Sequence, residues 1–282
     1  MTPKKAVIVL LLFVFFGFSV DFGSNHKTKE EYYPDGKLKA VYTYNDAGLL
    51  DGAAKKYYPN GKLQSEETYK NNILDGRSKE YYESGTLKEE GNFKDGKQEG
   101  ILKNYYENGK LKDVVHCKDG KLDGTAKGYY ESGKLKTDVN WKDGKQEGLS
   151  KTYYGSGTLQ DEVNWKDDKQ EGIAKGYYEN GKLEDEEKWK DGKPEGMAKY
   201  YYENGNLKAE GNFKDGKRDG ILRNYFENGK LEAEGNFKDG KPDGMAKTYY
   251  ESGTLKDEGE WKDGKWIWRK CYDEQGSLIE CN

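Results

Sequence analysis

Residues Gly100–Gly124 read GILKNYYENGKLKDVVHCKDGKLDG, and this pattern returns every 24 residues along most of the 282-residue chain. An aromatic pair, Tyr105–Tyr106 in this stretch, marks the register and occurs in ten copies, followed by a shortened copy around Tyr272. The other pairs are Tyr32–Tyr33, Tyr57–Tyr58, Tyr81–Tyr82, Tyr129–Tyr130, Tyr153–Tyr154, Tyr177–Tyr178, Tyr201–Tyr202, Tyr225–Phe226 and Tyr249–Tyr250. A fixed period of this kind indicates one continuous repeat array rather than separate domains.

Two turn signals interrupt each repeat. The first is Asn-Gly or Ser-Gly, as at Asn108–Gly109, and the second is Lys-Asp-Gly-Lys, as at Asp95–Gly96. Asn-Gly favours a tight hairpin turn because both residues tolerate positive φ. An acidic residue and a glycine follow the second turn, as at Glu99–Gly100. We therefore expect consecutive antiparallel hairpins joined as a meander.

Between the turns, apolar and polar residues alternate with the period of two that β-strands require. Leu135, Thr137, Val139 and Trp141 point to one side, and the charged residues between them point to the other. The two rings of each Tyr pair must face opposite sides, and the pattern leaves open which ring joins the Trp side. The prediction is an all-β fold, an elongated single-sheet array of tandem 24-residue β-hairpin repeats. About 20 strands at ~4.8 Å spacing would make a sheet on the order of 100 Å long.

The composition fits a thin sheet. Hydrophobic residues make up 33% of the chain and charged residues 35%, whereas average domains have about 45–50% apolar residues. The 48 Lys and Arg nearly balance the 52 Asp and Glu, and both signs are interspersed. Nucleic-acid binders usually concentrate a basic excess on one face. We therefore expect no nucleic-acid partner, and a solvated sheet face with cross-strand ion pairs.

Residues 1–24 differ from the repeats and are predicted to form a signal peptide. Lys4 and Lys5 precede an unbroken apolar run of 15 residues, Ala6 to Val20, which Asp21 ends. Such a run is typical of secretory signals, whereas a membrane span needs about 20 apolar residues. We expect an exported protein (periplasmic, cell-surface or extracellular) from which the segment is cleaved. Retention as a short anchor is the alternative.

The repeat resembles a known family. GNFKDGKRDG at 211–220 and GNFKDGKPDG at 235–244 resemble the core of the MORN repeat. With its YYENGKLK half, the unit looks like the bacterial MORN variant of YwqK-type antitoxins, over about residues 30–270. The resemblance implies a binding or scaffolding surface without catalytic residues, and an antitoxin- or immunity-like role in the envelope. Asp or Glu stands where the better-known repeat favours His before Gly, so lipid contact is not expected.

We expect no enzyme activity, no metal and no cofactor, because no acid–base or nucleophile pair stands outside the repeat slots. Only two His occur, His26 and His116, and neither has a partner at metal-ligand spacing. The loop at residues 95–100, like the equivalent loop of the other repeats, faintly resembles a calcium-binding loop. Lys97 stands there in place of an oxygen ligand, so turn geometry is the preferred interpretation.

The candidate binding surface consists of aromatic residues. Tyr provides a large contact area at low entropic cost, and rows of aromatic rings can stack on sugars. The residues are Tyr105, Tyr129, Tyr153, Tyr177, Tyr201, Trp141, Trp165 and Trp189. The first hypothesis is a scaffold that binds an unidentified protein partner. The alternative is a glycan- or cell-surface-binding module that uses the aromatic ladders.

The two ends of the array are expected to differ. About ten repeats over 25–265 lead into a predicted capping hairpin at 266–282, because repeat arrays need capped ends. Cys271 and Cys281 flank the last turn and are a candidate disulfide, which would fit an oxidising compartment. Cys117 takes the place of an aromatic residue and is expected to be a buried free thiol. No N-terminal cap is evident, and self-association or pairing with a partner strand through that sheet edge is a further hypothesis.

Overall fold

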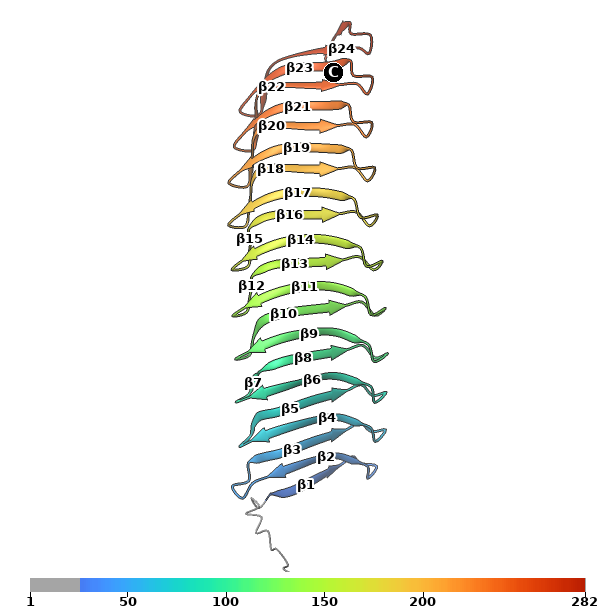
Figure 1. The fold of residues 1–282 in the computed structure, drawn as a ribbon, viewed down its shortest axis with the longest axis vertical. Coiled ribbons are helices and arrows are strands. Elements are labelled where there is room, and N and C mark those ends of the chain that lie inside the picture. The colour runs from blue at the N-terminus through green and yellow to red at the C-terminus, as the bar shows by residue number, and fades with distance from the viewer. Residues whose placement is uncertain (1–25, 282) are drawn as a thin grey trace, which may run out of the picture.

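The computed structural model describes residues 26–281, and these form a single antiparallel sheet without helices (Figure 1). The sheet contains 25 strands, and each hairpin pairs with the one before and after it in the chain. The predicted all-β, single-sheet array of hairpin repeats is confirmed. The predicted signal peptide at 1–24 lies outside the described residues.

Figure 1 shows the strands stacked along one long axis, with their turns aligned on two long edges. Three repeats have their first strand divided in two, at Glu99, Glu147 and Glu171. The strands are β1 Lys27–Tyr32, β2 Leu38–Tyr44, β3 Leu50–Tyr57, β4 Leu63–Lys70, β5 Ile73–Tyr81, β6 Leu87–Lys94, β7 Lys97–Gln98, β8 Gly100–Tyr105, β9 Leu111–Lys118, β10 Lys121–Tyr129, β11 Leu135–Lys142, β12 Lys145–Gln146, β13 Gly148–Tyr153, β14 Leu159–Lys166, β15 Lys169–Gln170, β16 Gly172–Tyr177, β17 Leu183–Lys190, β18 Lys193–Tyr201, β19 Leu207–Lys214, β20 Lys217–Tyr225, β21 Leu231–Lys238, β22 Lys241–Tyr249, β23 Leu255–Lys262, β24 Lys265–Tyr272 and β25 Leu278–Ile279.

The two kinds of turn have different geometry. At the second turn Asp119 and Gly120 both have positive φ, 51° and 78°, as a tight type I′ turn requires. At the first turn only Gly109 does, with φ 82°. There the amide of Tyr106 donates to the carbonyl of Lys110 at 2.8 Å, which closes a wider three-residue loop. The tight hairpin turn expected at Asn-Gly is therefore a three-residue loop in which Asn108 does not take positive φ. Asn108 instead accepts a hydrogen bond from the Lys110 amide at 2.9 Å.

The register divides the side chains between two faces. Trp141 is opposite Gly124 and Val139 is opposite Ala126, whereas Lys127 is opposite Asp138. Because opposed residues share a face and successive residues alternate, the first two pairs lie on one side of the sheet. We call this side the aromatic face and the side of Lys127 and Asp138 the charged face.

The sheet has only a thin core, and it lies on the aromatic face. The buried apolar residues are small: Ala40, Ala54, Cys117, Ala198 and Cys271. No large side chain among the described residues is fully buried. The array must therefore depend on contacts between neighbouring repeats rather than on a central core.

One edge of the array is connected by the second Tyr of each pair. The hydroxyl of Tyr106 donates to the carbonyl oxygen of Tyr129 in the next repeat at 2.7 Å. The same bond, 2.6–2.9 Å long, is made by Tyr33, Tyr58, Tyr82, Tyr106, Tyr130, Tyr154, Tyr178, Tyr202 and Tyr250. Phe226 occupies this position in one repeat and has no hydroxyl. We call this series the tyrosine ladder.

The opposite edge is connected by the acidic residue before the repeat glycine. The side chain of Glu99 accepts a hydrogen bond from the amide of Asp119, in the next turn, at 3.0 Å. The amide of Gly120 donates to the carbonyl of Gln98 at 3.0 Å. Equivalent carboxylate bonds join Asp95 to Asp75, Asp143 to Asp123, Asp167 to Glu147, Asp191 to Glu171, Asp215 to Glu195 and Asp239 to Asp219. The acidic slot, which departs from the better-known repeat, thus has a structural role.

The two ends of the sheet differ. At the C-terminal end, Cys271 and Cys281 form a disulfide with a Cα–Cα distance of 5.3 Å, which closes the hairpin of β24 and β25. The rings of Trp261 and Trp266 lie 4.0 Å apart beside it. At the N-terminal end, β1 pairs with β2 alone among the described strands. Its outer backbone groups therefore face no strand of residues 26–281.

The tyrosine ladder predicts a stabilising substitution. Phe226→Tyr should supply the missing hydroxyl to the carbonyl of Tyr249 and raise the free energy of unfolding by about 1 kcal/mol, the usual net value of one hydrogen bond. Tyr154→Phe should lower it by a similar amount. Urea denaturation of residues 26–282, followed by circular dichroism, measures both. Tyr129→Phe is the matched control, because its hydroxyl makes no hydrogen bond to other described residues. The ladder would be contradicted if all three substitutions had the same effect.

The disulfide predicts a thiol count. Denatured, unreduced protein should show one reactive thiol, that of Cys117, which is the free cysteine and is buried in the fold. Burial also raises the pKa of this thiol, so the native protein should react slowly with alkylating reagents. Ellman titration before and after denaturation provides both numbers. Three reactive thiols in the denatured, unreduced sample would mean that the bridge does not form.

Candidate binding surface

The charged face is a ladder of alternating charges. The Tyr-bearing strand of most repeats presents a basic residue, and the following strand presents an acidic one. The ion pairs include Lys127–Asp138 at 3.1 Å, Lys151–Glu162 at 2.7 Å and Lys175–Glu186 at 3.1 Å. These side chains are partly exposed to solvent, so each pair contributes little to stability. The ladder leaves the face nearly neutral over most of its length.

The five predicted Tyr residues, Tyr105, Tyr129, Tyr153, Tyr177 and Tyr201, lie on the charged face. The first ring of each pair is therefore on this side, and the second ring joins the Trp side. The hydroxyl of Tyr105 donates to Glu90 of the preceding repeat at 2.8 Å. Burial, followed by this bond to the carboxylate, raises the pKa of Tyr105 to about 12. Tyr105 thus remains neutral near pH 7, and the row offers partly exposed rings at regular intervals.

The three predicted Trp residues lie on the opposite, aromatic face. Trp141, Trp165 and Trp189 are each opposite a glycine of the preceding strand. The indole nitrogen of Trp165 donates to the hydroxyl of Ser150 at 2.7 Å, so this ring packs over a small residue of the thin core. The structure therefore separates the predicted surface into two rows that one compact partner cannot contact together.

Sequence reasoning missed a row of exposed apolar side chains on the charged face. They occupy the slot directly after the repeat glycine and are 39–50% exposed. The members are Ile101, Leu149, Ile173, Met197, Ile221 and Met245. Five of them come from successive repeats, so neighbours are two strands, or about 9.6 Å, apart. We call this series the apolar row. The sequence shows that an apolar residue follows the repeat glycine in most copies. Only the strand register shows that these residues lie on the charged face.

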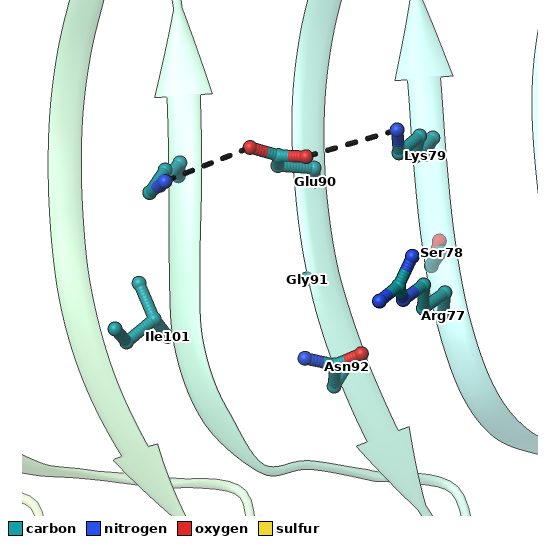
Figure 2. A pocket seen from close by; sticks show the side chains of 8 residues that line it. Arg77, Ser78, Lys79, Glu90, Gly91, Asn92 and Ile101 are labelled. Atoms are coloured by element: carbon teal, nitrogen blue, oxygen red, sulfur yellow. Dashed lines mark ion pairs between the residues drawn. The ribbon is translucent and has the colours of Figure 1, made fainter.

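A pocket of about 300 Å³ lies on the charged face between β5, β6 and β8 (Figure 2). Lys79 and Lys103 flank Glu90, with nitrogen–oxygen distances of 3.9 and 3.8 Å. The lining of this pocket also includes Arg77, Asn92 and Ile101. A smaller pocket of about 170 Å³ occupies the equivalent place further along and is lined by Ile221, Glu234, Asn236, Met245 and Lys247. The site therefore recurs with the repeat, and Arg77 distinguishes the larger copy.

The aromatic face differs in its electrostatics. Asp185 and Glu187 lie there on β17, and burial, together with the charges of Glu187 and Glu184, raises the pKa of Asp185 to about 6. Tyr200 donates a hydrogen bond to Glu187. Near the C-terminal end this face has an apolar depression of about 240 Å³, whose lining includes Phe237, Pro242, Trp261 and Trp266.

Two further properties concern the described residues only. No group of three or more His, Cys, Asp or Glu within residues 26–281 is arranged to hold a metal ion. The same part of the chain contains no helix long and apolar enough to cross a bilayer. His116 lies on the charged face, where its Nδ1 is 2.9 Å from the carbonyl of Thr125.

Two solved structures contain a part that is similar to this chain, and both are much larger proteins. One is described as the crystal structure of TcdB2-TccC3, with 12% identity, a TM-score of 0.19, and coverage of 90% of this chain and 18% of that chain. Another is the Tc holotoxin pore of Photorhabdus luminescens, with 12% identity, a TM-score of 0.21, and coverage of 89% and 14%. The chain spans less than a fifth of either, and at these TM-scores the likeness supports no functional inference. No curated protein matches the sequence.

The model of the MORN repeat variant family matches ten segments that together cover more than half of the chain. They are residues 25–46, 50–71, 74–95, 98–118, 122–143, 146–167, 170–191, 194–215, 218–239 and 242–263. The model of the MORN repeat itself matches residues 90–101 and 210–221. These matches follow the hairpins of the sheet along its length, and the chain therefore belongs to the MORN repeat variant family.

Proposed function

We propose that this repeat scaffold is non-catalytic and binds a protein partner through its charged face. The observation that carries the proposal is the apolar row, in which five successive repeats leave a large apolar side chain exposed at the same slot. Single exposed apolar residues are ordinary on protein surfaces, but aligned ones are typical of interaction sites. The Tyr row on the same face adds rings of the kind that anchor protein interfaces.

Burial of the apolar row against a protein partner should be favourable in free energy. Covering one half-exposed Ile, Leu or Met side chain should contribute on the order of 1 kcal/mol, since full burial contributes about 1.5–3 kcal/mol. Five such contacts would support specific binding, although area alone does not set affinity. The near neutrality of the alternating charges matters as well, because the ladder neither attracts a polyanion strongly nor repels an ordinary protein surface. Repeated slots also allow a partner with several contact points to bind by avidity.

The place of action follows from the two ends of the chain. The disulfide between Cys271 and Cys281 is of a kind that persists in oxidising compartments. The apolar run in residues 1–24 resembles that of a secretory signal, which supports export. We therefore place the scaffold in the cell envelope or outside the cell. An immunity-like role, in which the array binds and neutralises a toxin there, is the most specific form of the proposal and takes up the YwqK-type antitoxin resemblance.

A second function, glycan or cell-surface binding, has one observation in its favour. Trp141, Trp165 and Trp189 form a straight row on the aromatic face, about two strand spacings apart. Rows of aromatic rings suit a linear polymer. The indoles are largely covered, however, and Trp165 is hydrogen-bonded to Ser150. The apolar row, whose members are 39–50% exposed, lies on the other face, so we rank glycan binding second.

The proposal predicts that charge in the apolar row abolishes partner binding. Residues 26–282, carrying a photo-crosslinker and a purification tag, are incubated with the envelope fraction of the producing cell. The wild type should capture one specific protein, and the double variant Ile173→Asp/Ile221→Asp should lose it by at least about tenfold. Thr125→Asp is the matched control, because Thr125 occupies the same slot in another repeat and is already polar and exposed. Thermal melting should show that all variants remain folded.

Three outcomes would count against the proposal. Equal capture by the wild type and the double variant would remove the apolar row from the binding surface. Loss of capture in Thr125→Asp as well would indicate a general charge effect. Recovery of polysaccharide alone, with Trp fluorescence changing on titration and Trp165→Ala abolishing the change, would favour the glycan function instead.

A further inference from the structure

Two departures from the repeat pattern lie close together on the charged face. In the slot of the apolar row, β5 carries Arg77 instead of Ile, Leu or Met. In the acidic slot of the charge ladder, β9 carries Val114, which is opposite Lys103. Each departure increases the positive charge of the same stretch of the face. The pocket shown in Figure 2 lies in this stretch.

The ion pairs around this pocket leave positive charge unbalanced. Glu90 is shared between Lys79 at 3.9 Å and Lys103 at 3.8 Å, and neither contact is short. Glu66, on the other side of Lys79, is paired with Lys55 at 2.9 Å. Val114 offers Lys103 no second carboxylate.

Arg77 has no charge partner among the described residues. Within residues 26–281 the guanidinium of Arg77 makes no ion pair, and the residue is exposed. Figure 2 shows it extending from β5 toward β6, level with Gly91. Three cations therefore face one carboxylate across a pocket of about 300 Å³.

Other repeats show the balanced state of the same site. Lys151 has Glu162 at 2.7 Å. Arg223, which corresponds to Lys79, lies between Glu210 and Glu234 at 3.5 and 3.4 Å. In that repeat the position of Arg77 is taken by Ile221, so the pocket is more apolar. The excess at Arg77 is thus a local property and not a consequence of the repeat.

We propose that this pocket binds a carboxylate side chain of the protein partner. A guanidinium can hold a carboxylate with two parallel hydrogen bonds. Lys79 and Lys103 supply further positive charge, the amide of Asn92 can donate, and Ile101 provides an apolar wall for the methylene groups of a Glu. The inference rests on the proposed function, since it names the chemistry by which the partner is held at one stretch of the charged face.

The distribution of charge favours an acidic protein segment over a membrane or a nucleic acid. Anionic lipid surfaces and nucleic acids present phosphates over a wide area and need an extended basic patch. Along most of this face Glu and Asp alternate with Lys, so a flat anionic surface would meet as many carboxylates as ammonium groups. A single Asp or Glu side chain fits the confined excess.

Fluorescence anisotropy with a labelled octaglutamate peptide at low ionic strength tests the inference, because exposed charges are less screened there. Residues 26–282 should bind the peptide. Arg77→Gln should weaken binding by about tenfold, the factor expected for loss of a charged hydrogen bond. Lys151→Gln is the matched control and should leave binding nearly unchanged, because it removes one charge from a balanced repeat. Arg77 makes no ion pair within the described chain, so its substitution should not unfold the protein.

A variant that gains a binding site tests the inference without relying on loss of peptide binding. The double variant Ile221→Arg/Glu258→Val, which reproduces both departures because Glu258 lies opposite Lys247, should convert the smaller pocket into a second site and raise the stoichiometry of peptide binding from one to two. Absence of peptide binding, equal weakening by Lys151→Gln and Arg77→Gln, or binding only to vesicles of phosphatidylserine and phosphatidylcholine would each overturn the inference. Partner capture that depends on Ile173 and Ile221 but not on Arg77 would overturn it while leaving the proposed function intact.

Discussion

The array depends on hydrogen bonds that pass from one repeat to the next at its two edges. A single sheet with a thin core cannot rely on buried apolar area, and its largest side chains all remain partly accessible. The tyrosine hydroxyls on one edge and the acidic side chains on the other instead connect each turn to its neighbour. Because these bonds join only adjacent repeats, stability should accumulate along the array. This constraint fixes the residues of the turns and leaves the middle of each strand free to vary.

The freedom in the middle of the strands is where the two faces acquire different roles. On the aromatic face, rings such as that of Trp165 cover small residues such as Ser150 and form the thin core. The charged face has no such covering, so its apolar row stays exposed among paired charges. A surface of this kind suits a partner that contacts several repeats at once. Arg77 and Val114, on β5 and β9, interrupt its regularity and would give an otherwise uniform surface one distinct stretch.

The architecture could be predicted from the sequence because the same pattern of residues recurs in every repeat. The Tyr pairs, the Gly-containing turns and the period of two predicted the meander, and the spacing of Cys271 and Cys281 suggested a bond that the structure contains. The turn at Asn108–Gly109 was misread, because Asn-Gly serves both two- and three-residue loops and the loop length depends on strand register.

The candidate surface was harder to predict for a related reason. Alternation places Tyr105 and Trp141 on opposite faces only once the bulge between Asn104 and Tyr105 is known. From sequence, the acidic residue before each glycine was interpreted only as a sign against lipid contact. It is an acceptor for the next turn, which only three-dimensional proximity reveals.

The most direct test of the account is oxidative footprinting of the scaffold in complex with its captured partner. Met197 and Met245 report on the charged face, where they are 45% and 41% exposed, and Trp141, Trp165 and Trp189 report on the aromatic face. We expect the partner to protect both Met residues from oxidation and to leave the oxidation of the Trp residues unchanged. Protection of the Trp residues with unchanged Met oxidation would contradict it and place the binding surface on the aromatic face.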